Sequence, residues 1–231
     1  MSDMVVRFSR GQRVEHFAVM VTFTVLCLTG LPQKFFQADL SVALIQAMGG
    51  LGVVRWLHRF AGLLFAGMTA LHLFNVVRGS ISGRLRLSLV VDRQDFRDAI
   101  TTLKYYLGLS NTQARFGRYD YRQKFEYWGM ILGSVIVIGT GFVLLYPITV
   151  AAWLPAQIIP AAKAMHSQEG LLAFLTIVIW HIYNAHLNPD VFPFDPAIFT
   201  GKISRHRMMH EHPLEYEEKF APTGPPAAPK A

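Results

Sequence analysis

The chain has 231 residues, of which 52% are hydrophobic and only 16% are charged, whereas a soluble domain carries about 25% charged residues. This composition favours a membrane protein over a soluble globular one. The net charge is +7, but Lys and Arg avoid the apolar runs and gather in connecting segments, so the excess indicates membrane topology and excludes a nucleic-acid partner.

Four segments are long and apolar enough to cross a hydrocarbon layer, which takes about 20 residues. They cover 16–36, 54–77, 125–146 and 164–185. Arg7, Arg10 and Arg13 precede the first, as they would a signal peptide, but no small-residue cleavage site follows. We therefore expect four retained helices, an all-α integral membrane four-helix bundle that occupies residues 1–205.

The placement of Lys and Arg predicts the orientation of these helices. Basic residues fill the amino-terminal arm, the second connection and the start of the tail, whereas the first and third connections are nearly free of them. By the positive-inside rule, both termini and the second connection are cytoplasmic. The basic residues of the second connection are Arg78, Arg84, Arg86, Arg93, Arg97, Lys104, Arg115, Arg118, Arg122 and Lys124.

Three further elements are expected outside the spans. Apolar residues at three- and four-residue steps over 92–109, with Asp92 at the N-cap, predict an amphipathic helix on the cytoplasmic surface. The third connection holds Trp153 in an apolar stretch that suits the far membrane interface. The tail, 206–231, is rich in Pro and Ala from 220 onward and is expected to be cytoplasmic and disordered, with His206, His210 and His212 solvated.

Histidines in the spans carry the chemistry. His58 and His72 lie fourteen residues apart in the second span, and His166 and His181 fifteen apart in the fourth. Each pair extends over roughly 21–23 Å of helix, with both members within about 60° of one face. Imidazoles in hydrocarbon are costly unless they are bonded, so such a set is functional by default.

The topology pairs these histidines at two depths. His58 and His166 lie toward the non-cytoplasmic side and form one pair, while His16, His72 and His181 compete for two positions on the cytoplasmic side. Neutral imidazole suits haem iron, whereas zinc would need a tight cluster with Cys or carboxylates. The single Cys27 leaves no c-type attachment motif, so the pattern predicts b-type haem held by coordination and packing.

Other features in the spans have two interpretations each. Glycines in the second to fourth spans indicate the close approach of a bulky group or of another helix. Arginines at helix entrances could pair with haem propionates or with lipid headgroups. These arginines are Arg10, Arg13, Arg55 and Arg59, and the glycines are Gly62, Gly67, Gly129, Gly133, Gly139, Gly141 and Gly170.

Several motifs follow one another in order from the amino terminus to about Ser204. They are Arg7-Phe8-Ser9-Arg10 with Arg13 and His16-Phe17, Leu28-Thr29-Gly30-Leu31, Trp56-Leu57-His58-Arg59 with Gly62, Leu103-Lys104-Tyr105-Tyr106-Leu107-Gly108, Gly117-Arg118-Tyr119 with Gln123-Lys124-Phe125, and His181-Ile182-Tyr183. In this order and spacing they resemble a known family, the cytochrome b or gamma subunit of membrane-bound formate dehydrogenase, with relatives in respiratory hydrogenases and thiosulfate reductases.

The resemblance implies a di-haem subunit of the bacterial inner membrane that exchanges electrons between a periplasmic oxidoreductase or multihaem cytochrome and quinone or menaquinone. It implies one haem on His58 and His166 and another on His16 and His181. His72 and the fifteen-residue spacing depart from the family pattern. A pairing of His72 with His181, as in cytochrome bc complexes, and a third haem on His16 and His186 therefore stay open.

A quinone-linked function predicts a polar site near the cytoplasmic-side haem. An alternative from another class is a proton-relay transporter or a pure membrane anchor without haem, although the spans contain few carboxylates. A third is an autonomous oxidoreductase with a small soluble donor, which the absence of a flavin motif disfavours. For the polar site near the cytoplasmic-side haem, the candidate residues are His16, His72, Tyr183, Asn184, His186, Lys124, Glu126 and Tyr127.

Overall fold

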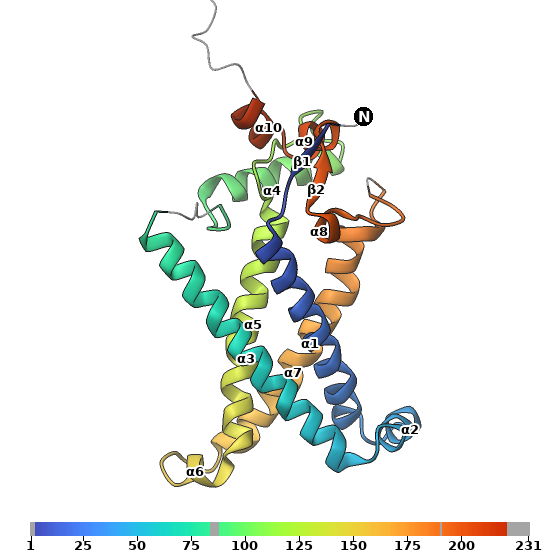
Figure 1. Cartoon of the computed structure of the whole chain (residues 1–231), viewed down its shortest axis with the longest axis vertical. Helices are drawn as coiled ribbons and strands as arrows, with labels where there is room; N and C mark the ends of the chain where they lie inside the picture. Colours follow the sequence, from blue (N-terminus) through green and yellow to red (C-terminus); the bar gives the residue numbers. More distant parts are fainter. Residues whose placement is uncertain (1–2, 84–87, 190, 221–231) are drawn as a thin grey trace, which may run out of the picture.

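The computed structural model describes residues 3–83, 88–189 and 191–220 and is almost entirely helical (Figure 1). Its four long helices are each apolar enough to cross a membrane, which confirms the predicted spans and makes the chain a multi-pass membrane protein. The elements are α1 (Arg10–Lys34), α3 (Leu51–Ile81), α5 (Tyr121–Leu145) and a fourth helix built from α7 (Ile158–Leu175), η1 (Thr176–His181) and η2 (Tyr183–Leu187).

Local capping explains where two of the long helices begin. Ser9 and Gln12 form a reciprocal capping box at the start of α1, and Asp120 and Gln123 form another at the start of α5. Each box satisfies backbone N–H groups that the first helical turn leaves without partners.

The four helices form a closed ring. The most extensive packing joins α1 to α3 and α5 to α7, and smaller interfaces of α3 with α5 and of α1 with α7 complete the bundle. Few side chains are fully buried; those on α3 are Val54, Ala61 and Phe65. Most large apolar side chains therefore face outward, as a lipid environment requires, or line the bundle interior.

The two ends of the bundle differ. At one end lie α2 (Asp39–Ala47), which we had not expected, and α6 (Pro147–Ala151) (Figure 1). We call this the α2–α6 end. Trp153, which follows α6, is 86% exposed, as expected for a side chain at a membrane interface.

The predicted amphipathic surface helix is present as α4 (Arg93–Tyr106), and Asp92 caps it through a capping box with Asp95. Asp95 is buried and forms an ion pair with Lys124 of α5 at 2.8 Å. The apolar side chains of α4 are exposed, among them Phe96, Ile100 and Leu103. The helix thus attaches to the bundle by its polar side and leaves its apolar side for the membrane surface.

The opposite end carries a small cap. Strand β1 (Met4–Val6) pairs antiparallel with β2 (Lys202–Ser204), and α8 (Ala197–Thr200), α9 (Arg205–Glu211) and α10 (Pro213–Phe220) pack beside them. Ala197, Ile203 and Met208 form its core. Disorder of the tail from residue 206 is therefore wrong for 206–220, because these residues bury a hydrophobic core. Arg84, Arg86 and residues 221–231 lie outside the described residues.

Gly201 closes the junction between the two ends of the chain. It ends α8 with a φ of +79°, and its carbonyl accepts hydrogen bonds from the backbone N–H groups of Arg7 and Phe8. A Cβ at this position would lie 2.7 Å from the Phe8 carbonyl oxygen. Only glycine meets both the backbone conformation and the space here.

His212 is buried in this cap, and the expectation that it is solvated is wrong. Its Nδ1–H donates to the Gly117 carbonyl oxygen at 2.8 Å. Burial, followed by the charge of Arg7, lowers the pKa of His212 to about 4. His206 and His210 are exposed, as predicted.

This burial makes docking of the tail sensitive to acid. The undocked His212 titrates near pH 6.5 and the docked one near pH 4, so the undocked tail binds more protons between these values. The contribution of His212 to the stability of the docked tail is complete above pH 6.5 and falls as the pH drops toward 4. We expect docking to be about 2 kcal/mol weaker at pH 5 than at pH 7, measured by amide hydrogen exchange over 205–220. His212→Asn should abolish this pH dependence and His206→Asn should retain it; the reverse would show that His212 is not the group responsible.

Candidate cofactor-binding site

The first histidine pair joins α3 and α7 near the α2–α6 end. The ring centroids of His58 and His166 lie 6.1 Å apart, with the ring planes at 78°. The structure thus brings together the two residues that the sequence analysis paired on the non-cytoplasmic side.

The second pair joins α1 and η1 toward the cap. The ring centroids of His16 and His181 lie 6.2 Å apart, with the ring planes at 35°. Of the three histidines expected to compete at this depth, the fold brings these two together.

The spacing of both pairs fits a metal ion between two imidazoles. A metal–imidazole bond of about 2.0–2.1 Å, plus about 1.1 Å from the nitrogen to the ring centre on each side, separates two such centroids by about 6.2–6.4 Å. Among the described residues no group of three or more His, Cys, Asp or Glu gathers closely enough to bind a metal. The donor sets are therefore two-imidazole sets, which suit haem iron rather than zinc.

Hydrogen bonds orient three of the four rings. His166 donates from Nδ1 to the Val137 carbonyl oxygen at 2.9 Å, and His181 donates from Nδ1 to the Glu126 carboxylate. His58 Nδ1 lies 2.9 Å from the Thr29 hydroxyl. With Nδ1 protonated, Nε2 keeps its lone pair, as a metal-binding imidazole requires.

A cavity of about 880 Å³ surrounds the first pair. This volume is in the range of cofactor pockets. Six glycines line it, and a Cβ on Gly30 or Gly141 would lie within 3.1 Å of His58 or 3.3 Å of His166. These glycines leave room for the two rings, while Gly62, Gly129 and Gly170 border open space.

Charged groups also line this cavity. Four are basic, namely Lys34, Arg55, Arg59 and Lys163, and they could neutralise propionates. Arg13 instead donates to the Phe199 carbonyl oxygen and so ties α1 to the cap. Glu169 also lines the cavity but was not among the predicted site residues. Its Oε1 would lie 2.6 Å from a Cβ on Gly133. The signal in the sequence was a carboxylate inside an apolar run.

A change of helix type lies in the fifteen-residue spacing of His166 and His181. Over η1 and η2, backbone N–H groups bond to carbonyls five residues back, as Ile182 does to Ile177 and Asn188 to Tyr183. In a regular helix fifteen residues overshoot four turns by about 60°. A π-turn holds one residue more, so it offsets the additional residue and turns His181 back toward the His166 side of the helix.

His72 has a different environment from the one expected of a ligand. Its Nδ1 donates to the Glu15 carboxylate at 2.6 Å, and its Nε2 lies 2.9 Å from the Tyr127 hydroxyl. Both ring nitrogens have protein partners, because α3 turns His72 toward Glu15 and Tyr127. His72 was expected among the metal ligands, but in the structure both of its ring nitrogens contact protein side chains.

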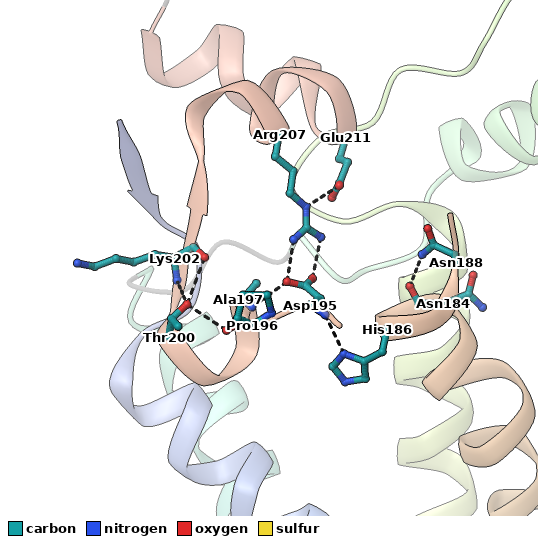
Figure 2. A network of polar contacts seen from close by, with 10 residues as sticks. All are labelled: Asn184, His186, Asn188, Asp195, Pro196, Ala197, Thr200, Lys202, Arg207 and Glu211. Atoms are coloured by element: carbon teal, nitrogen blue, oxygen red, sulfur yellow. Dashed lines mark hydrogen bonds and ion pairs between the residues drawn. The ribbon is translucent and has the colours of Figure 1, made fainter. Parts of the chain in front are cut away.

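His186 also lacks the geometry of a ligand. Its Nδ1 accepts a hydrogen bond from the Asp195 backbone N–H at 3.3 Å (Figure 2). Its ring stacks on Phe194. His16 faces His181 rather than His186. Among the described residues, the ring contact of His16 is with His181, at a centroid distance of 6.2 Å.

Comparison with known proteins agrees with this geometry. The chain is 25% identical over 217 residues to the cytochrome b556(Fdn) subunit of nitrate-inducible formate dehydrogenase from Escherichia coli, which covers 94% of this chain and 92% of that protein. It is 24% identical to the cytochrome b556(fdo) subunit of formate dehydrogenase from the same organism, over 94% and 93%. It is 23% identical to the cytochrome b556 subunit of formate dehydrogenase from Haemophilus influenzae, over 93% and 83%.

The sequence profile of prokaryotic cytochrome b561 matches residues 7–191, which include the four long helices and both histidine pairs. The profile match and the four apolar helices together indicate membrane electron transfer through haem b. The chain belongs to the prokaryotic cytochrome b561 family and is a membrane-bound b-type cytochrome.

Proposed function

We propose that this cytochrome holds two b haems, one between His58 and His166 and one between His16 and His181, and passes electrons between a periplasmic partner and the quinone pool. The observation that carries the proposal is the presence of two imidazole pairs toward opposite ends of one bundle. Within each pair the ring centroids lie 6.1 or 6.2 Å apart. Haem iron at each pair supplies one-electron redox chemistry.

The polypeptide orients the histidine rings that would hold the haems and supplies positive charge near them. Val137 and Glu126 accept hydrogen bonds from Nδ1 of His166 and His181, which leaves Nε2 of each ring with its lone pair for a metal. The basic residues of the cavity, Arg55 and Arg59 on α3 among them, would balance the charge of haem propionates near the first pair.

The charge distribution supports a bacterial inner-membrane orientation with both termini and α4 in the cytoplasm. His16 and His181 then lie toward the cytoplasm, and His58 and His166 toward the periplasm. Electrons from a periplasmic donor would reach the α2–α6 end first. The relatives are subunits of formate dehydrogenases, which favours a catalytic or multihaem partner on that side.

Quinone chemistry fits the cytoplasmic-side pair. Reduction of a quinone takes two electrons and two protons, so its site needs polar groups within reach of the cytoplasm. Glu126, His72, Tyr127 and His186 lie around this end of the bundle and supply such polar groups. Membership of a cytochrome family removes the haem-free transporter from consideration.

The test uses the detergent-purified full chain. We expect a pyridine haemochrome assay to give two b haems per polypeptide and a menaquinol analogue to reduce part of them. Three haems would restore His16 and His186 as ligands. Two haems that no quinol reduces would contradict the link to the quinone pool while leaving the di-haem assignment intact.

A further inference from the structure

His186 lies in a fixed aromatic setting at the end of η2. Its ring is nearly parallel to Phe194, with centroids 4.7 Å apart, and Phe199 lies 6.4 Å away. Phe194 and Phe199 are 52% and 42% exposed, so the stack presents a flat apolar surface. His186 lies in η2, which directly follows the η1 segment that ends at His181.

The hydrogen bond between His186 and the Asp195 backbone determines which ring nitrogen of His186 can donate. Asp195 N–H donates to Nδ1, so the neutral ring carries its proton on Nε2. Across the part of the chain that the structure describes, no hydrogen bond occupies this Nε2–H. The neutral ring therefore has one available donor on a fixed axis.

The position of Asp195 depends on α9. Arg207 donates from Nη1 and Nη2 to the two oxygens of Asp195, at 2.7 Å each, and from Nε to Glu211 at 2.6 Å (Figure 2). Asp195 also accepts from Ala197 N–H at 2.8 Å. Burial alone would raise the pKa of Asp195, but the hydrogen bonds from Arg207 and Ala197 hold it below its usual value, so the bidentate pair persists at neutral pH.

We infer that α9, through the Arg207–Asp195 pair, positions His186 as the hydrogen-bond donor to a carbonyl oxygen of the quinone. The inference rests on the proposed function and adds a residue of the tail to it, since Arg207 lies beyond the region 7–191 that matches the family. A quinone ring is flat and apolar with carbonyl acceptors, and the stack of Phe194 and His186 offers a matching surface with one donor. Arg207 is thus a positioning residue that acts through His186.

The experiment measures quinol oxidation by the full holoprotein in lipid nanodiscs, with a menaquinol analogue as the two-electron donor and a soluble one-electron oxidant as the acceptor that reoxidises the haems. Arg207→Gln should raise KM about tenfold, the effect of one misplaced hydrogen bond, with kcat changed less and haem content at the wild-type value. Arg205→Gln is the matched control, because Arg205 on the same helix pairs with exposed Asp3 at 2.9 Å and lies over the Phe220 ring at 4.2 Å, away from the Asp195–His186 contact. Its KM should equal that of the wild type.

Two further variants separate positioning from general stability. If Arg207 acts through His186, His186→Phe combined with Arg207→Gln should have the KM of His186→Phe alone, whereas a structural role would add the two effects. Arg207→Lys, which keeps the charge but loses the bidentate geometry, should give an intermediate KM even where Arg207→Gln fails to fold.

The outcomes distinguish the two proposals. A wild-type protein with haem that no quinol reduces overturns the proposed function and this inference together. A reactive wild type with additive effects in the double variant, or with an unchanged KM in Arg207→Lys, overturns only the role of α9.

Discussion

His181→Ala is expected to lower the haem b content from two to one per chain, whereas His72→Ala leaves it at two. His181 faces His16 at a centroid distance that suits one metal, and its Nδ1 proton is held by Glu126, so its other nitrogen is free to coordinate. His72 uses both nitrogens in bonds to Glu15 and Tyr127. The measurement is a pyridine haemochrome assay per polypeptide, with a redox titration to show which centre remains.

His72→Ala is a close control, because it also removes an imidazole from the same depth of the bundle. It should lose only the hydrogen bonds to Glu15 and Tyr127, which is expected to lower the thermal stability slightly without changing the haem count. Loss of a haem in His72→Ala, with retention in His16→Ala, would contradict the pairing and favour His72 with His181.

Glu215→Gln is expected to release the tail from the bundle. Arg7 and Glu215 are 3% and 4% exposed and lie 2.5 Å apart, and Arg118 and Lys219 also bind this carboxylate at 2.8 Å each. Without the carboxylate, the buried Arg7 guanidinium loses its counter-charge, which costs about 3–5 kcal/mol. Amide exchange and limited proteolysis over 205–220 at pH 7 would report the loss of docking.

Glu217→Gln is the matched control on the same helix. Glu217 pairs with Arg115, but their side chains are 55% and 57% exposed, so loss of this pair should cost at most about 1 kcal/mol because water screens it. Equal destabilisation by the two variants would show that burial of the Arg7–Glu215 pair does not govern docking.

Local sequence determined the spans and the surface helix. A run of about 20 apolar residues has to satisfy its own backbone hydrogen bonds in hydrocarbon, so it forms a helix whatever its neighbours are. Asp92 likewise caps α4 through residues that directly follow it. The depth of each histidine follows from the same periodicity, which is why His58 and His166 could be paired in advance.

Tertiary structure decided which imidazoles meet at the second pair. His16, His72 and His181 share one depth, and depth alone does not tell which face of a helix points to which neighbour. The packing of α1 against α7 and η1 turns His16 to His181, and α3 turns His72 to Tyr127. The π-helical turn of η1, which offsets the additional residue before His181, corresponds to no motif in the sequence.

The cap depended most on the three-dimensional fold. The hydrogen bond between Arg7 and Glu215 joins residues 208 positions apart, and the burial of His212 depends on the distant Gly117 carbonyl. In sequence the tail is polar and lacks a long apolar run, so composition predicted disorder. The sequence by itself determined the membrane helices and the depths of their histidines, because these follow from the apolar runs and the positions of the histidines within them. The second pairing depends on how the helices pack, and the folded tail depends on the burial of its charges against distant segments.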